Sequence, residues 1–460
     1  MSLFSPAAEA TPEVLERFRH RKLSSPSGGS RPEASPCPAA PRAAADLGVG
    51  PETLLQLVLK HLHTGGAQRL DTLGRNLGVP ASLLQDTIAF LRREHLVEVH
   101  GARPGAPSGT ETYFLTQQGR ERARSHLLDD GYIGPVPVPL DQFQRQIEAQ
   151  SVAGTVVDRA SMAEAFAGLV VPERVLEQLG AAFNSASSLF LYGPAGTGKT
   201  MLATQFARLL QGEVAVPYAF SVDGQIVRVF DPVYHVPTES RAPESGAASL
   251  GRGGEDQDRR WVRCRRPVVI AGGELTADML EPAHHAAGNF YEAPLQVKAA
   301  GGLLMIDDLG RQQVDVTTLL NRWVVPLESG VDYLALRSGA KFPVPFDAFP
   351  VFATNLRPKD LADNAFLRRL GYKVHLGPLD EDGYRAIFAQ YCRANGLEYR
   401  DQAVTYLLRE HYEPTGTPLI ACHPRDLVNK IIEFALFEGE EPGLTEEALA
   451  RAWNVYFVQE

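Results

Sequence analysis

A chain of 460 residues is long enough for two or three domains, each with its own hydrophobic core. Its hydrophobic content of 44% and charged content of 22% are ordinary for a globular protein. The formal net charge of −10 argues against a surface coated for nucleic acid, although it leaves room for a local basic patch. No apolar run approaches the roughly 20 residues of a bilayer-spanning helix, and no signal-peptide core is evident, so we expect a cytoplasmic location.

The sequence predicts neither a disulfide framework nor a zinc site. The cysteines form no CxxC pair, so we expect reduced thiols. The histidines at 61 and 63, and those at 284 and 285, have no cysteine or acidic partners at zinc-site spacing, which favours surface or packing roles. The four cysteines are Cys37, Cys264, Cys392 and Cys422.

Residues 1–50 are dominated by Ala, Pro, Ser, Gly and charged residues, as in SSPSGGSRPEASPCPAAPRAAAD. Such a composition buries too little apolar surface to offset the entropy of ordering the chain. We therefore predict a disordered tail over residues 1–50.

The pattern becomes helical at Pro51, where apolar residues recur at a spacing that gives one apolar face. Two shorter helical patterns follow, RLDTLGRNLGVP and ASLLQDTIAFLRREHLV, with Gly78 and Pro80 in the turn between them. LVEVHG and ETYFLT predict two strands around a Gly/Pro-rich tip, and residues 117–128 predict a closing helix. This order resembles a winged helix-turn-helix domain over residues 51–130.

The charges of this segment do not favour DNA binding. Phosphate neutralisation supplies most of the non-specific affinity for DNA, and acids and bases nearly cancel over the segment. DNA contact remains possible, but docking to protein or contacts within an oligomer are favoured. The charged residues concerned are Arg92, Arg93, Arg103, Asp86, Glu94 and Glu98.

A Pro-rich stretch, GYIGPVPVPL, begins at Gly131 and predicts an extended, semi-rigid linker over residues 131–144. Residues from about 141 to 187 are expected to be helical and to lead into the nucleotide-binding motifs.

The strongest motif is SLFLYGPAGTGKT, which fits the GxxxxGK[ST] phosphate loop, or Walker A motif, after a short apolar strand. Its glycines allow backbone N–H groups to wrap a phosphate, while Lys199 reaches the β- and γ-phosphates and the Thr200 hydroxyl binds magnesium. A helix that starts at Lys199 adds its positive dipole end. The predicted nucleotide-binding residues of this segment are Gly193, Pro194, Ala195, Gly196, Thr197, Gly198, Lys199, Thr200 and Met201.

GGLLMIDDLG, at residues 301–310, predicts the Walker B strand. A strand that is apolar at every position is buried on both faces, as in a parallel sheet, and its end points at the phosphates. Asp307 is the expected magnesium carboxylate. Asp308 stands where such strands usually have a Glu that polarises the attacking water. Its side chain is one methylene shorter than that of Glu. We therefore predict a slow but real ATPase.

With these two motifs, residues 145–460 resemble the AAA+ ATPases. FATN, ending at Asn355, looks like sensor 1, and that resemblance makes Asn355 the group that helps to position the lytic water. NAFLRRLGYKVHL looks like the arginine-finger segment, in which Arg368 or Arg369 reaches the γ-phosphate of the neighbouring subunit. A finger in trans implies a ring, with a hexamer expected.

Two further segments extend the resemblance. CHPRDLVNKIIEFAL is similar to the start of the lid helix, and it places Arg425 as sensor 2. GLVVPERVLEQL is similar to the stretch before the phosphate loop, where Val170 and Val171 would flank the adenine. The implied ligands are ATP and Mg²⁺.

A narrower resemblance covers LLNRWVVPLESGVDYLALRSGAKFPVPFDAFPVFATN, where a helix precedes a strand pair around residues 337–340. It is similar to the pre-sensor-1 hairpin of MoxR-like and magnesium-chelatase-like proteins, a clade associated with chaperone-like remodelling. The GAFTGA loop of sigma-54 activators is absent. A polar insertion over residues 231–260 is expected to be a mobile surface loop. WVRCRRPVVIAGG follows, with Arg263, Arg265 and Arg266 at its start, where a solvated strand end is favoured over contact with a client, nucleic acid or an acidic neighbour.

The predicted fold is α/β, with strands near 188, 217, 268, 303, 350 and 373 in a parallel nucleotide domain at 145–379 and a helical lid at 380–460. The predicted function is magnesium-dependent ATP hydrolysis that remodels or assembles an unidentified protein client. The alternatives are a DNA-associated ATPase or regulator, and a nucleotide-gated scaffold with weak hydrolysis. Neither the client, the ring size, nor the choice between Arg368 and Arg369 follows from the sequence.

Overall fold

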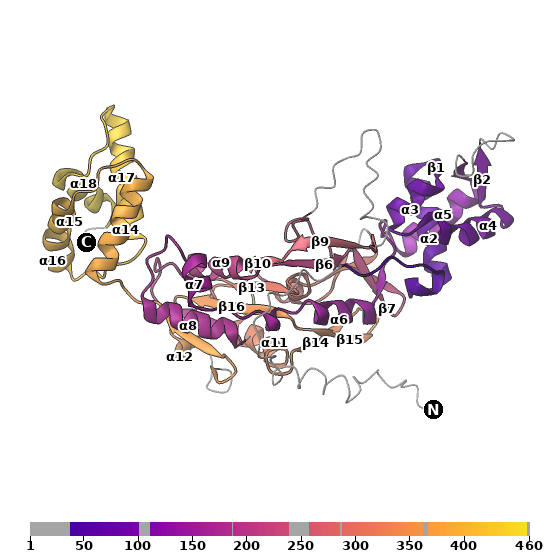
Figure 1. Cartoon of the computed structure of the whole chain (residues 1–460), viewed down its shortest axis with the longest axis horizontal. Coiled ribbons are helices and arrows are strands. Elements are labelled where there is room, and N and C mark those ends of the chain that lie inside the picture. The colour runs from indigo at the N-terminus through magenta and orange to yellow at the C-terminus, as the bar shows by residue number, and fades with distance from the viewer. Residues whose placement is uncertain are drawn as a thin grey trace.

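The computed structural model describes residues 37–100, 111–185, 187–238, 257–285, 288–361 and 367–457. Figure 1 shows an elongated molecule, with a helical C-terminal part at one end, an N-terminal module at the other and a sheet-rich body between them. Among these described residues, no helix is both long and apolar enough to cross a bilayer.

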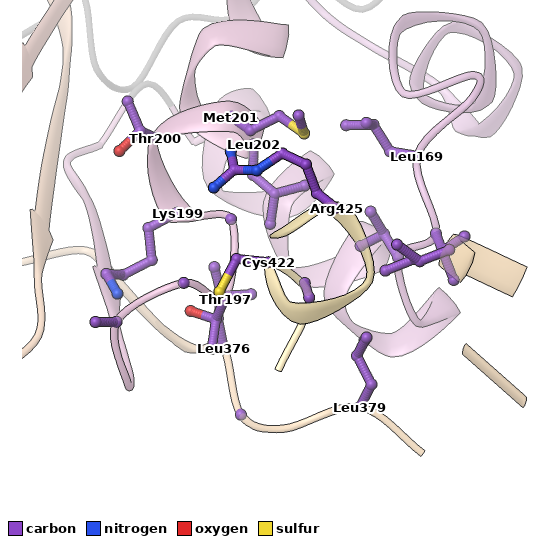
Figure 2. A pocket seen from close by; sticks show the side chains of 18 of the residues that line it. Leu169, Thr197, Lys199, Thr200, Met201, Leu202, Leu376, Leu379, Cys422 and Arg425 are labelled. Carbon is purple, nitrogen blue, oxygen red and sulfur yellow. The ribbon is translucent and has the colours of Figure 1, made fainter. Parts of the chain in front are cut away.

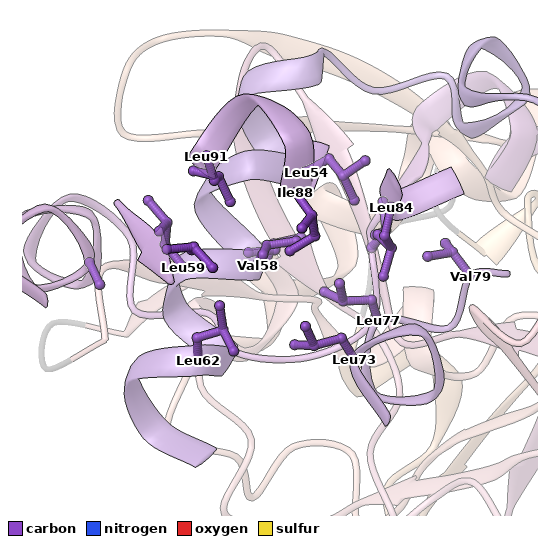
Figure 3. Close-up of a cluster of buried hydrophobic side chains, with 14 of the residues drawn as sticks. Leu54, Val58, Leu59, Leu62, Leu73, Leu77, Val79, Leu84, Ile88 and Leu91 are labelled. Atoms are coloured by element: carbon purple, nitrogen blue, oxygen red, sulfur yellow. The ribbon is translucent and has the colours of Figure 1, made fainter. Parts of the chain in front are cut away.

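The N-terminal module consists of helices packed against a small antiparallel sheet of order β1-β3-β2. The leucines and other apolar residues of its helices point into one buried cluster (Figure 3). Its predicted tip, with Arg103, lies outside the described residues. The elements are α2 (Pro51–Gly65), β1 (Gln68–Arg69), α3 (Leu70–Leu77), η2 (Ala81–Leu84), α4 (Gln85–Arg93), β2 (Val97–His100), β3 (Thr112–Leu115) and α5 (Gln117–Asp129).

The body is built on a five-stranded sheet of order β10-β13-β16-β5-β17, in which every neighbouring pair is parallel. This sheet confirms the predicted α/β fold class. Along β13, an inner strand of this sheet, Leu303 and Met305 face one core while Leu304 and Ile306 face another, so the strand is buried on both sides. The strands are β5 (Leu189–Tyr192), β10 (Val268–Ala271), β13 (Gly302–Ile306), β16 (Ala348–Thr354) and β17 (Tyr372–His375).

Helices cover both faces of this sheet. Residues of α7, α8 and α9 share one core with the strands, and residues of α11 share the other. The helices of the body are α6 (Leu140–Ala149), η3 (Val152–Gly154), α7 (Arg159–Ala165), α8 (Glu173–Asn184), α9 (Lys199–Leu209), η4 (Ala277–Leu280), α10 (Leu295–Lys298), α11 (Val316–Ser329) and α12 (Pro358–Leu361).

The strand expected near residue 217 does not belong to the parallel sheet. It forms β6 (Glu213–Pro217), which pairs in antiparallel register with β9 (Trp261–Arg265). Arg263 of β9 forms an ion pair with Glu213 at 2.5 Å, and Arg266 donates to the carbonyls of Gln150 at 2.9 Å and Gly301 at 2.6 Å. Arg263 therefore contacts an acidic neighbour, which is one of the contacts that the sequence analysis considered for these arginines.

A second five-stranded sheet joins the body to the N-terminal module. Its order is β11-β12-β8-β7-β4, and Ala219, Ile226 and Phe290 from it enter the apolar cluster of the module. Its strands are β4 (Val138–Pro139), β7 (Ala219–Val222), β8 (Gln225–Arg228), β11 (Ala283–His285) and β12 (Phe290–Glu292). A separate antiparallel hairpin is formed by β14 (Val331–Ala335) and β15 (Lys341–Pro345), at the place predicted for the strand pair.

Two segments expected to be loose, and a linker expected to be extended and semi-rigid, are packed in the described structure. The tail prediction is wrong for residues 37–50, where η1 (Ala44–Leu47) buries Leu47 to 2% exposure; residues 1–36 lie outside the described residues. The Pro-rich segment is extended at β4 but does not stand apart as a spacer: Tyr132, Val136 and Val138 are buried, β4 pairs with β7, and α6 already begins at Leu140. Alternating apolar residues between the prolines here find a sheet edge and a helical module to pack against.

The insertion expected to be a mobile surface loop is buried at both described ends. His235, Asp258 and Arg260 are each about 1% exposed, while residues 239–256 lie outside the described part of the chain. The Arg260 guanidinium pairs with Asp258 at 2.8 Å and donates to the Leu47 carbonyl at 2.9 Å and to Gln142 Oε1 at 3.3 Å. One arginine thus connects the insertion, the segment before the module, and α6.

Removing Arg260 should destabilise the protein strongly. Arg260→Met leaves the buried Asp258 carboxylate without its counter-charge, and breaking such a pair costs about 3–5 kcal/mol. Urea unfolding measures the loss. The exposed Arg145–Asp141 pair, 2.7 Å long, is the control, and Arg145→Met should cost below about 0.5 kcal/mol. Equal losses of unfolding free energy in the two variants would contradict this role of the buried Arg260–Asp258 pair. The double variant Arg260→Met with Asp258→Leu should recover most of the stability.

The C-terminal part is helical, as predicted, and has its own apolar core, which includes Tyr384, Phe388 and Trp453. Inside it, a chain of hydrogen bonds runs from the Tyr384 hydroxyl to the Tyr412 hydroxyl at 2.8 Å and on to His423 Nδ1 at 2.9 Å. The elements are α14 (Glu381–Ala394), α15 (Asp401–Leu407), the π-helical turn η5 (Leu408–Tyr412), α16 (Glu413–Thr415), α17 (His423–Glu438) and α18 (Glu446–Tyr456).

Candidate nucleotide site

The loop between β5 and α9 has backbone conformations that require glycine. Gly196 and Gly198 have φ values of 79° and 88°, in the left-handed region, and Gly198 directly precedes the first turn of α9. At Gly193, a Cβ atom would lie 2.0 Å from the Leu376 carbonyl oxygen. The glycines thus let the loop curl tightly at a helix N-terminus, the arrangement that binds phosphate.

Lys199 is held inside this loop and is only 7% exposed. Its Nζ donates to the carbonyls of Gly193 at 2.9 Å and Pro194 at 2.8 Å. Burial lowers the pKa of Lys199, and the nearby carboxylates of Asp308 and Asp307 oppose that shift. The ammonium therefore sits beside the loop where a phosphate would be wrapped.

The end of β13 faces the start of α9. The Thr200 hydroxyl donates to Asp307 Oδ2 at 2.7 Å. Among the described residues there is no cluster of three or more His, Cys, Asp or Glu side chains able to hold a metal ion. One hydroxyl and one carboxylate fit Mg²⁺, which keeps several waters and takes its other ligands from substrate phosphates. Thr200 and Asp307 would hold it.

Asp308 lies at a sharp turn after the strand, with φ of 48°, which is uncommon for a residue other than glycine. Its backbone N–H donates to Asp307 Oδ1 at 2.9 Å, and Asn355 Nδ2 donates to Asp308 Oδ1 at 3.3 Å. The two residues predicted to handle the attacking water are therefore in contact. Strained backbone of this kind is concentrated at functional sites.

The C-terminal helices reach the phosphate loop through Cys422. Its backbone N–H donates to the Gly196 carbonyl at 3.1 Å, and a Cβ added at Gly196 would lie 2.4 Å from Cys422 Sγ. Arg425, one turn further along α17, lines the same pocket as Lys199 and Thr200 (Figure 2). A hydrogen bond from Arg425 Nε to Asp426 Oδ1, 2.8 Å long, raises the pKa of Arg425.

These groups line one cavity of about 730 Å³, within the range of roughly 300–1,000 Å³ for small-molecule sites. Val170 and Val171 line it together with Leu379, Ile387 and Tyr391 from the C-terminal part, which gives it an apolar side suited to a base. Of the predicted loop residues, Ala195 to Met201 line the cavity, whereas Gly193 and Pro194 contribute the carbonyls that accept from Lys199.

Neither predicted finger lies in this cavity. Arg369 forms an ion pair with Glu328 of α11 at 2.6 Å, and Arg368 does not line the pocket. Part of the predicted finger segment, residues 364–366, lies outside the described residues.

Sequence reasoning missed Arg311, His375, Gln390 and Cys422, all of which line the cavity. It also missed Gln312, whose amide donates to the carbonyls of Asp307 at 2.8 Å and Asp308 at 3.1 Å. Arg311 and Gln312 follow the two acids by only a few residues, so their position after the strand was an available signal. His375 and the lid residues reach the site only through the tertiary fold.

Comparisons with known proteins give one family match and several similar structures. A model described as a domain of unknown function, DUF8689, matches residues 380–455, which span most of the C-terminal helices. A search with the sequence finds no match among curated proteins.

Two of the similar solved structures come from different bacteria. NtrX from Brucella abortus in complex with ADP is 15% identical, with a TM-score of 0.37, over 61% of this chain and 54% of that one. The RuvB Holliday junction branch migration motor of Thermotoga maritima is 16% identical, with a TM-score of 0.35, over 63% and 70%. The match thus spans little more than half of the NtrX chain.

Proposed function

We propose that this protein is an AAA+-type ATPase that binds ATP and hydrolyses it with magnesium. The observation that carries the proposal is the 2.7 Å contact between Thr200 and Asp307, in the same cavity as Lys199 and the Asp308–Asn355 pair. A phosphate loop and an acidic strand end that meet in this way supply the positioning and charge that phosphoryl transfer requires.

Each residue has one role in this proposal. Loop N–H groups and Lys199 bind the phosphates, Thr200 and Asp307 bind Mg²⁺, and Asp308 orients the attacking water. Asn355 donates to the Asp308 carboxylate, and Arg425 brings a positive charge from the lid. Bound Mg²⁺ would neutralise charge that develops on the phosphates.

Phosphate release tests the activity directly. The purified protein should release phosphate from ATP in the presence of Mg²⁺. This release should stop when EDTA removes the metal. Tight ATP binding with almost no release, while the protein still assembles, would instead identify a nucleotide-gated scaffold.

Asp308→Glu should raise turnover about tenfold, because general-base catalysis depends first on reach and Glu restores the missing methylene. Steady-state phosphate release at saturating ATP measures the change. Asp308→Asn, which keeps the shape and removes the charge, is the matched control and should lose turnover. A parent enzyme with no turnover, or a Glu variant no faster than the parent, would contradict this account of the short acid.

We further propose that the client is a protein and that the chain works as an oligomeric ring, expected to be a hexamer. The β14–β15 hairpin supports a MoxR-like remodelling role, because it stands between the Walker B strand and sensor 1. The N-terminal module has the element order of a winged helix. On its helix α4, Phe90 is 41% exposed beside Arg93, a surface better suited to a protein than to phosphates.

Two experiments separate the client classes. Copurification with Asp308→Asn, which should hold ATP without hydrolysing it, would identify the client. Salt-dependent retention of the full-length chain on duplex DNA would favour a DNA-associated role instead.

A further inference from the structure

Three cationic side chains line the nucleotide cavity, and two of them are already engaged. Lys199 donates to the loop carbonyls of Gly193 and Pro194, and Arg425 pairs with Asp426. The third, Arg311, is exposed, and within the described residues its guanidinium has neither a hydrogen bond nor an ion pair. An arginine that lines a cavity and is not paired with a carboxylate there is available to bind an anionic ligand.

The backbone beneath Arg311 is fixed. Its N–H donates to the Asp308 carbonyl at 3.0 Å, which closes a turn directly after the two acids. Gln312 ties that turn to the end of β13, because its amide donates to the carbonyls of both acids and its oxygen accepts from Gly310 N–H at 2.8 Å. Thr354 adds a bond from its hydroxyl to the Leu309 carbonyl at 2.7 Å.

Gly310 permits this turn. Its φ of 106° lies in the region that favours glycine, and a Cβ there would approach Leu356 Cδ1 to 3.0 Å. Arg311 is therefore attached, through a rigid turn, to the same strand end that presents Asp307 and Asp308. Its Cα position is set before any ligand arrives, and only the side chain has to move.

The charges of the cavity indicate which part of the nucleotide Arg311 would meet. The loop and Lys199 belong to the phosphate end of the cavity, and so do Asp307, Asp308 and Asn355, whereas Val170 and Val171 form its apolar side. Arg311 follows the two acids, so it belongs with the phosphate end. A magnesium-bound triphosphate still carries net negative charge there, close to two carboxylates that repel it.

We propose that Arg311 binds the terminal phosphate of the nucleotide held by its own chain and thereby lets the protein distinguish ATP from ADP. This inference rests on the proposed ATPase function. It concerns a residue of the same chain as Lys199, so it is separate from the finger expected from a neighbouring subunit.

Nucleotide affinity tests the proposal. For Arg311→Ala, titration calorimetry with Mg²⁺ should show affinity for a non-hydrolysable ATP analogue about tenfold weaker, with ADP affinity changed less than about twofold. Arg311→Lys keeps the charge without the fork and should recover part of the discrimination. Arg357→Ala is the control, since Arg357 is exposed, pairs with Asp360 at 3.0 Å and does not line the cavity.

The outcomes separate this inference from the proposed function. If the parent binds both nucleotides and Arg311→Ala binds each as tightly as the parent does, the assignment of Arg311 is wrong while the ATPase proposal stands. Equal weakening for ADP and the analogue also overturns it, because that result indicates contact with the phosphates both nucleotides share. A parent that binds neither nucleotide overturns both proposals.

Discussion

Replacing Lys199 by alanine should abolish ATP binding. The ammonium is the only lysine charge among the described cavity-lining residues, and it is held by two carbonyls of the loop that would wrap the phosphates. Losing a charge-assisted contact to the β- and γ-phosphates in a partly buried site should weaken affinity about a hundredfold or more. Equilibrium titration with a fluorescent ATP analogue measures the loss.

A thermal shift gives a second measurement of the same effect. ATP stabilises a protein that binds it only in the folded state, so the rise in Tm seen for the parent with ATP should disappear in Lys199→Ala. Lys359→Ala is the control, because Lys359 is exposed and does not line the cavity. Normal phosphate release by the Lys199 variant would show that the site has been wrongly assigned.

Arg369→Ala should leave ATP affinity unchanged and lower turnover roughly a thousandfold, the effect expected of an arginine finger. Arg369 does not line the cavity of its own chain, which fits the proposed finger, because such a finger would act on the nucleotide of a neighbouring subunit. Turnover should then rise with protein concentration in the parent and stay low at all concentrations in the variant. Arg368→Ala, assayed in parallel, determines which of the two adjacent arginines acts.

The Arg369–Glu328 ion pair allows a structural role to be separated from a catalytic one. Glu328→Gln breaks the same 2.6 Å pair but keeps Arg369, so it should retain turnover if Arg369 acts on phosphate. Arg159→Ala, which breaks an exposed pair of equal length with Glu177, should leave turnover unchanged. If Glu328→Gln were as slow as Arg369→Ala, the pair itself would be the cause and the finger assignment would fall.

The parallel sheet could be predicted because its inner strands, β5, β13 and β16, are short apolar runs that are buried almost throughout. The phosphate loop could be predicted because its residues are contiguous, and the two acids because they follow such a strand directly. The strand near residue 217 has a similar local pattern. Only its partner at 261–265 shows that it pairs outside the sheet, and sequence periodicity does not specify a partner.

The packed tail, linker and insertion could not be predicted for a related reason. Composition measures what a segment can bury by itself, whereas Leu47, Val136 and Val138 are buried by distant parts of the chain. Arg260 and Asp258 appeared to be surface charges in a polar insertion. They are buried as a pair because the Leu47 carbonyl and Gln142 supply hydrogen bonds that the local sequence does not reveal.

The packing of the Pro-rich segment after the module has a consequence for how a rotation of the body would affect the module. Tyr132, Val136 and Val138 are packed, and Val136 N–H is bonded to the Leu77 carbonyl at 2.8 Å, so this segment attaches the module firmly to the body. A small rotation of the nucleotide-binding body would then be carried to the far end of the elongated chain (Figure 1) as a larger sweep of α4. The N-terminal helices would thus be displaced further than the body by a rotation centred in the body.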